Sequence, residues 1–121
     1  MTNYLVTGGQ GFLGSALVFH LLKNKNHKVY ILDNQSRKRS YIKIKSKRAI
    51  YIKGDVRTKK LNFISKIDIV YHLAYINGTI NFYKYPDKVL DVGINGTFNL
   101  INQINKYGRN IKKFIYASSS E

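Results

Sequence analysis

A glycine-rich turn near the N-terminus constrains this chain more than any other feature. The segment TGGQGFLG, residues 7–14, joins a short strand-like segment to a segment of helical period. It places Gly8, Gly11 and Gly14 between the two elements. In such a context the first glycine permits a tight turn, the second lets the backbone approach a pyrophosphate, and the third allows the helix to pack closely on the strand.

The start of the following helix is the second half of this pattern. The first turn of a helix carries N–H groups without intrahelical acceptors, and these bind phosphate oxygens. The sequence therefore predicts a dinucleotide-binding turn in which Phe12 and Leu13 belong to the first helical turn. A tight strand-to-helix turn without a ligand is the alternative.

Short apolar segments alternate with longer segments of helical period through the whole chain, which is typical of a parallel α/β sheet. Right-handed crossovers then predict a Rossmann-type, doubly wound parallel sheet with strand order 3-2-1-4-5. The five expected strands cover residues 4–7, 28–33, 49–53, 68–74 and 114–118.

Two long helices are expected, and a short one over residues 59–65. The first covers residues 12–23, and the second covers residues 86–107, where the only proline, Pro86, suits a first helical turn. Residues 75–86 are expected to form a loop. The apolar stripes of the two helices consist of Leu13, Leu17, Val18, Leu21 and Leu22, and of Leu90, Ile94, Phe98, Ile101 and Ile104.

Asp33 ends the second predicted strand at the spacing from the glycines where a carboxylate accepts hydrogen bonds from ribose hydroxyls. Asn34 follows it directly. A 2′-phosphate would be repelled by Asp33, so the pattern favours NAD over NADP, although Arg37 and Lys38 lie close enough to weaken that preference. The alternative is that Asp33 caps the next turn.

Two further segments belong to the same predicted site. Asp55 and Val56 follow the third strand, where the carboxylate can accept from an adenine amino group and the valine can lie against the ring. Leu73 and Ala74 follow the fourth strand and are expected to form the floor where the cofactor crosses the sheet. His72 is interpreted as a structural histidine.

The formal net charge of +15 raises the possibility of nucleic-acid binding, because Lys and Arg bind phosphate backbones. Residues 37–48 are the densest basic run, but no recognition helix, zinc spacing or aromatic RNA-binding pattern accompanies them. We interpret the run as a solvated loop, and the excess of Lys, Asn, Ile and Tyr as a coding bias. Nucleic acid is therefore not an expected partner.

The remaining totals set broad limits. A chain of 121 residues corresponds to one domain, residues 1–121, with a real core. The absence of cysteine excludes disulfides, thiol nucleophiles and cysteine metal sites, and no metal site is predicted. There is no apolar run long enough to span a bilayer and no signal peptide, so we expect a cytoplasmic protein without a membrane partner.

Taken in order, these segments resemble the extended short-chain dehydrogenase/reductase family, specifically its NAD-dependent nucleotide-sugar epimerases and dehydratases. The resemblance rests on TGGQGFLGS, DNQSRKRS, GDVR, VYHLAYING, NGTFNL and KFIYASSSE, and covers the whole chain. It implies NAD as cofactor, hydride exchange with a hydroxyl of a nucleotide-sugar substrate, and a homodimer in the full-length enzyme.

The resemblance also implies a catalytic serine at the end of the fifth strand. Ser119 is the expected residue, with Ser118 and Ser120 as alternatives in register. The family's YxxxK pair is matched in spacing only by Tyr41 and Lys45, which lie on the adenosine side and are rejected. The family often has an asparagine where this chain has Gly93.

These departures predict a sheet truncated after strand five, without the catalytic tyrosine, lysine and sugar-binding portion. The 121-residue chain alone is therefore expected to be inactive, marginally stable and weak in NAD binding. A non-catalytic NAD-binding module and, more remotely, a basic nucleic-acid-binding protein are the alternative functions.

Overall fold

The computed structural model describes residues 1–36 and 43–118. All strand pairs in this part of the chain are parallel, and the sheet order is β3-β2-β1-β4-β5, which confirms the predicted topology. The strands are β1 (Thr2–Thr7), β2 (His27–Asp33), β3 (Ala49–Lys53), β4 (Ile69–His72) and β5 (Lys113–Tyr116).

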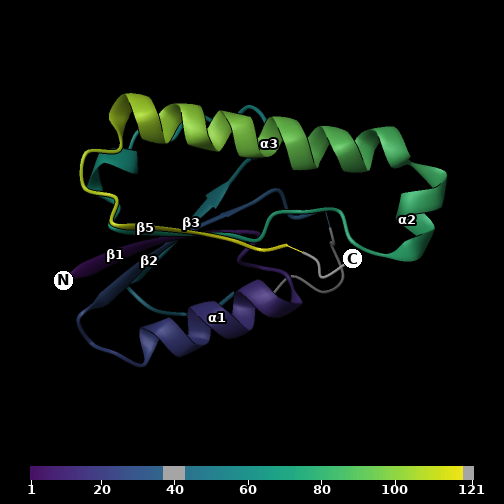
Figure 1. The fold of residues 1–121 in the computed structure, drawn as a ribbon. Coiled ribbons are helices and arrows are strands. Elements are labelled where there is room, and N and C mark those ends of the chain that lie inside the picture. The colour runs from purple at the N-terminus through teal and green to yellow at the C-terminus, as the bar shows by residue number, and fades with distance from the viewer. Residues whose placement is uncertain (37–42, 119–121) are drawn as a thin grey trace.

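Two helices cover opposite faces of the sheet. Figure 1 shows α1 (Phe12–Leu22) on one side and α3 (Pro86–Tyr107) along the other. The short helix α2 (Thr79–Lys84) precedes α3 where the sequence predicts a loop. The helix that the sequence predicts over residues 59–65 is a single 3₁₀ turn, η1 (Ile64–Lys66).

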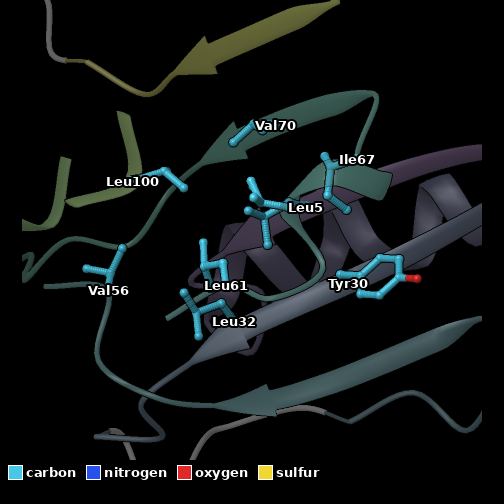
Figure 2. Close-up of a cluster of buried hydrophobic side chains, with 9 residues drawn as sticks. Leu5, Tyr30, Leu32, Val56, Leu61, Ile67, Val70 and Leu100 are labelled. Atoms are coloured by element: carbon cyan, nitrogen blue, oxygen red, sulfur yellow. The ribbon is translucent and has the colours of Figure 1, made fainter. Parts of the chain in front are cut away.

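The sheet separates two apolar cores because alternate residues of a strand point to opposite faces. Leu5 faces the α3 side, whereas its neighbours Tyr4 and Val6 face the α1 side. In Figure 2, Leu100 extends from α3 into the first core, which also contains Val70 of β4. Full burial of a leucine of this kind stabilises a fold by about 2 kcal/mol.

A small residue sets how closely α3 approaches the loop after β3. A Cβ on Gly96 would lie 2.6 Å from Cγ1 of Val56, so only glycine leaves room for this contact. The side chain of Asn99 also donates to the carbonyl of Val56, at 2.7 Å. These contacts hold the loop that carries Asp55 beneath the helix.

The apolar stripes predicted from spacing do not face the core along their whole length. In α1, Leu13 is 64% exposed, while Val18, Leu21 and Leu22 are buried. In α3, most of the stripe points outward: Leu90, Ile94, Phe98 and Ile101 are exposed, and only Ile104 packs against the core. The helix instead buries Gly96 and Leu100.

The basic run is only partly described, since residues 37–42, including Tyr41, lie outside the described ranges. Arg48 at its end is not a solvated loop residue. Its guanidinium donates to the carbonyl oxygens of Leu22, Asn24 and His27 at 2.8–2.9 Å. Arg48 therefore ties the loop before β3 to the C-terminal end of α1. No helix within residues 1–36 and 43–118 is long and apolar enough to cross a membrane.

Candidate functional site: a cleft at the carboxyl ends of the strands

A cleft of about 720 Å³ lies at the carboxyl ends of the parallel strands. Here the connection after β1 leads to α1 on one face, and the connection after β4 leads to α3 on the other. Ligands of open α/β sheets bind at such a switch point. The cleft is lined by all of the predicted cofactor residues, Gly8, Gly11, Phe12, Leu13, Gly14, Asp33, Asn34, Asp55, Val56, Leu73 and Ala74.

The glycine turn is compact enough to require glycine at positions 8 and 14. Gly8 has φ +71°, a left-handed conformation that favours glycine, and a Cβ there would lie 2.9 Å from the carbonyl oxygen of Leu73. A Cβ on Gly14 would lie 2.1 Å from the carbonyl oxygen of Gly8. The first turn of α1 is thereby held directly against the end of β1.

The N-terminus of α1 is open toward the cleft. Gly11 is the N-cap residue, and no side chain caps this end of the helix. The side chains of Phe12 and Leu13 are 89% and 64% exposed at the cleft. The N–H groups of this turn and the helix dipole therefore suit a pyrophosphate, which is the group the sequence pattern predicts.

Asp33 lies beside the glycine turn at the end of β2. Its carboxylate accepts from the backbone N–H of Gln10 at 3.0 Å and from that of Gln35 at 2.7 Å. An ionised carboxylate has about four lone-pair sites, so two bonds leave capacity for a diol. The side chain is half-buried and on the cleft, as a ribose-binding carboxylate requires.

The third-strand residues are constrained by other partners. Both carboxylate oxygens of Asp55 accept from Arg57, which also pairs with Asp91 of α3. The hydrogen bonds from the Arg57 side chain lower the pKa of Asp55. Val56 is only 6% exposed because it packs under α3. Adenine contacts by Asp55 and Val56 stay predictions.

A buried hydrogen-bond chain links β1, β4 and α3 below the cleft. The hydroxyl of Thr7 lies 2.7 Å from Nδ1 of His72, and Nε2 of His72 lies 2.9 Å from the hydroxyl of Thr97. Thr7 and His72 are fully buried, consistent with the structural role expected for the histidine. The backbone N–H groups of Leu73 and Ala74 donate to Thr7 Oγ1 at 3.0 and 3.1 Å.

The partners of Thr7 fix the tautomer of His72. Since Thr7 Oγ1 already accepts two N–H groups, its own proton goes to Nδ1, and Nε2 carries the imidazole hydrogen. Thr97 accepts that hydrogen and donates its own to the carbonyl of Gly93 at 2.6 Å. The chain needs a neutral imidazole, and burial lowers the pKa of His72 to about 4.

Tyr75 is a cleft residue that the sequence pattern does not identify. It follows the predicted floor residues Leu73 and Ala74 and lines the same cleft. Its ring lies edge-on to that of Tyr116, with centroids 5.9 Å apart. The spacing of residues in the sequence does not predict that Tyr75 lines the cleft, because the position of its ring depends on the residues of α3 that it contacts.

The predicted catalytic serine lies outside the described residues, as does its alternative Ser120. Ser118, the other alternative, lines the end of the cleft next to Tyr116 and Ala117. Fold and cleft therefore bring the end of β5 to the same cavity as the glycine turn. The role of Ser119 stays a prediction.

Comparisons with known proteins agree with this geometry. A family model described as the NAD dependent epimerase/dehydratase family matches residues 4–121. A dTDP-D-glucose 4,6-dehydratase of Dictyostelium discoideum is 35% identical over 130 residues, covering 97% of this chain and 29% of that protein.

Two solved structures have the same fold over 98% of this chain. An epimerase from Methanothermobacter thermautotrophicus has a TM-score of 0.85 and 31% identity, and 35% of that chain is covered. A UDP-glucuronic acid 4-epimerase from Bacillus cereus, in complex with UDP-glucuronic acid and NAD, has a TM-score of 0.80 and 29% identity, with 40% covered. The chain thus spans about a third of the length of these relatives. On the match over residues 4–121, it belongs to the NAD dependent epimerase/dehydratase family.

Proposed function

We propose that this chain forms the NAD-binding part of a nucleotide-sugar epimerase or dehydratase. The observation that carries the proposal is the uncapped start of α1 held beside the Asp33 carboxylate by the Gln10 hydrogen bond. A donor for pyrophosphate and an acceptor for a ribose diol are thereby adjacent, as a dinucleotide requires.

The proposed binding mode follows the strand order. The adenosine half lies over the ends of β2 and β3, with Asp33 and Asn34 at the ribose and Asp55 and Val56 at the adenine. The N–H groups of the first turn of α1 bind the pyrophosphate. The nicotinamide half then lies over β4 and β5, above Leu73 and Ala74.

In the natural protein, NAD would supply a reversible hydride acceptor for a sugar hydroxyl. The chain's contribution is to bind and orient the cofactor, and to place the end of β5 beside it. Ser119 is the proposed hydrogen-bond partner of the reacting hydroxyl. A UDP- or dTDP-sugar is the proposed substrate class, in line with the substrates named for the relatives.

A homodimer is proposed as the assembly, with α3 as the pairing element. Its exposed stripe of Leu90, Ile94, Phe98 and Ile101 is an apolar surface of the kind that marks a protein interface. A helix face of this kind can pair with its own copy about a two-fold axis. The expected cytoplasmic location stays a prediction.

Asp33→Asn tests the proposed function. The natural protein is expected to bind NAD more tightly than NADP. The substitution should raise the dissociation constant for NAD about tenfold, because a charge-assisted hydrogen bond is lost. The affinity for NADP should fall less, because the 2′-phosphate of NADP is no longer repelled by a carboxylate. Titration calorimetry measures both constants.

Asp87→Asn is the matched control, because Asp87 lies exposed in the first turn of α3 and does not line the cleft. It should leave both dissociation constants unchanged. An unmodified protein that binds no NAD at millimolar concentration would refute the proposal, as would an NAD preference insensitive to Asp33.

A further inference from the structure

Tyr75 is held at its backbone by β1. The two residues before it, Leu73 and Ala74, donate their N–H groups to the hydroxyl of buried Thr7 at 3.0 and 3.1 Å, and Leu73 N–H also lies 3.2 Å from the carbonyl of Thr7. The segment that carries Tyr75 is therefore fixed to the centre of the sheet.

The tip of the Tyr75 side chain is held by α3. Its hydroxyl lies 3.3 Å from Thr97 Oγ1. Thr97 gives its own hydrogen to Gly93 and accepts from His72, so the phenol is the donor in this contact. Burial raises the pKa of Tyr75 to about 12, which keeps the phenol protonated as this donor role requires.

Space for the ring comes from a glycine in α3. A Cβ on Gly93 would lie 3.2 Å from Cε1 and 3.6 Å from Cδ1 of Tyr75. The first distance is tighter than ordinary carbon contacts of about 3.5–4.0 Å. Any larger residue at position 93 therefore competes with the ring for the same volume.

The held ring borders the cleft at the end away from Asp33. Tyr75 lines the cleft together with Tyr116 and Ser118, at the ends of β4 and β5. Asp33 ends β2, on the other side of β1 in the sheet. A dinucleotide with its adenosine over β2 must bring its second ring to the Tyr75 end.

We propose that Tyr75, seated on Gly93, is the aromatic wall against which the nicotinamide half of the cofactor packs. The inference rests on the proposed function and adds a positioning residue to it. Because the ring is fixed at both ends before the ligand arrives, little side-chain freedom is lost on binding. Its contribution is confined to the nicotinamide half.

The test compares two ligands in the natural protein. NAD contains the nicotinamide ring, whereas ADP-ribose has the adenosine, pyrophosphate and second ribose without it. Tyr75→Ala is expected to raise the dissociation constant for NAD about fivefold to tenfold, which is the effect of one aromatic contact. The dissociation constant for ADP-ribose should stay within about twofold of its value in the natural protein. Tyr75→Phe keeps the wall and should leave both ligands within about twofold.

Tyr83→Ala is the matched control, since Tyr83 is 80% exposed on α2 and does not line the cleft. It should change neither constant. ADP-ribose binding by the Tyr75→Ala variant also reports that the protein is folded.

A second arm tests the pairing of Tyr75 with Gly93. Gly93→Asn is expected to weaken NAD selectively, as Tyr75→Ala does, because the new side chain displaces the ring. Once Tyr75 is alanine, Gly93→Asn should cost much less thermal stability than it does in the natural protein. This non-additivity is the signature of two groups that share one space.

The outcomes separate the two hypotheses. An NAD to ADP-ribose affinity ratio that Tyr75→Ala leaves unchanged would overturn the role of Tyr75 while the proposed function stands. Additive stability losses in the cycle would overturn the pairing with Gly93. If the unmodified protein binds neither ligand, the proposed function fails, and the inference fails with it.

Discussion

Thr7 and His72 occupy the same register position on the neighbouring strands β1 and β4. Their hydrogen bond lies directly below the floor of the cleft, whose backbone Thr7 also binds. The imidazole must be neutral, since both lone pairs of Thr7 Oγ1 are taken by the N–H groups of Leu73 and Ala74. A proton on Nδ1 would face a hydroxyl without an acceptor position. The floor of the cleft therefore depends on the protonation state of one buried histidine.

This dependence predicts a pH effect on stability. Burial lowers the pKa of His72 from 6.5 to about 4, so between these values the unfolded chain binds a proton that the folded one does not. The contribution of neutral His72 to the free energy of unfolding is complete above pH 6.5 and is lost as the pH falls toward 4. At pH 5 the loss is about 2 kcal/mol. Urea unfolding at pH 8 and pH 5 should show that His72→Gln reduces the difference between the two pH values.

His20→Gln serves as the control because His20 is exposed on α1. It should leave the pH dependence unchanged. An equal pH dependence in the natural protein and in His72→Gln would contradict the neutral, buried role of this histidine.

Residue identities predicted part of the site and left part of it hidden. Glycines at fixed spacing and a carboxylate at a strand end have their own physical requirements, so Gly8, Gly14 and Asp33 could be named from sequence. Tyr75 could not, because its placement depends on the space above Gly93 and on Thr97.

Among the elements, the strands and the two long helices were predictable because periodicity and turn residues agree over many positions. The helix α2 was not. It has six residues, none of them buried, and follows Gly78 at φ +106° without a side-chain cap. The orientation of the apolar face of α3 could not be predicted either. Residue spacing shows that a helix has an apolar face, but it does not show what covers that face.

The outward stripe of α3 leads to a prediction about assembly. Introducing charge with Ile94→Glu and Phe98→Glu should raise the dissociation constant of the proposed dimer more than tenfold, because both side chains would be desolvated in the interface. Sedimentation velocity of the natural protein measures the change.

Phe19→Glu on α1 is the matched control, because Phe19 is 58% exposed and Phe98 is 60% exposed. The α1 helix lies on the opposite face of the sheet, as Figure 1 shows. A natural protein that is monomeric at all accessible concentrations would contradict the proposed pairing through α3.

At the scale of the whole molecule, the parallel order of the strands brings all parts of the cleft to one edge of the sheet. The glycine turn, Asp33 and Tyr75 come from different segments, yet each follows or ends a strand. The order of these segments across the sheet gives the proposed binding mode a direction, with the adenosine expected on the β2 side and the nicotinamide on the β5 side.

A crystal structure of the natural protein with NAD would show the direction in which the cofactor binds. We expect the pyrophosphate within hydrogen-bond distance of the N–H groups of Phe12 to Gly14, a ribose diol on Asp33, and the nicotinamide ring against Tyr75. A cofactor bound in the reverse direction, or at another surface, would contradict it.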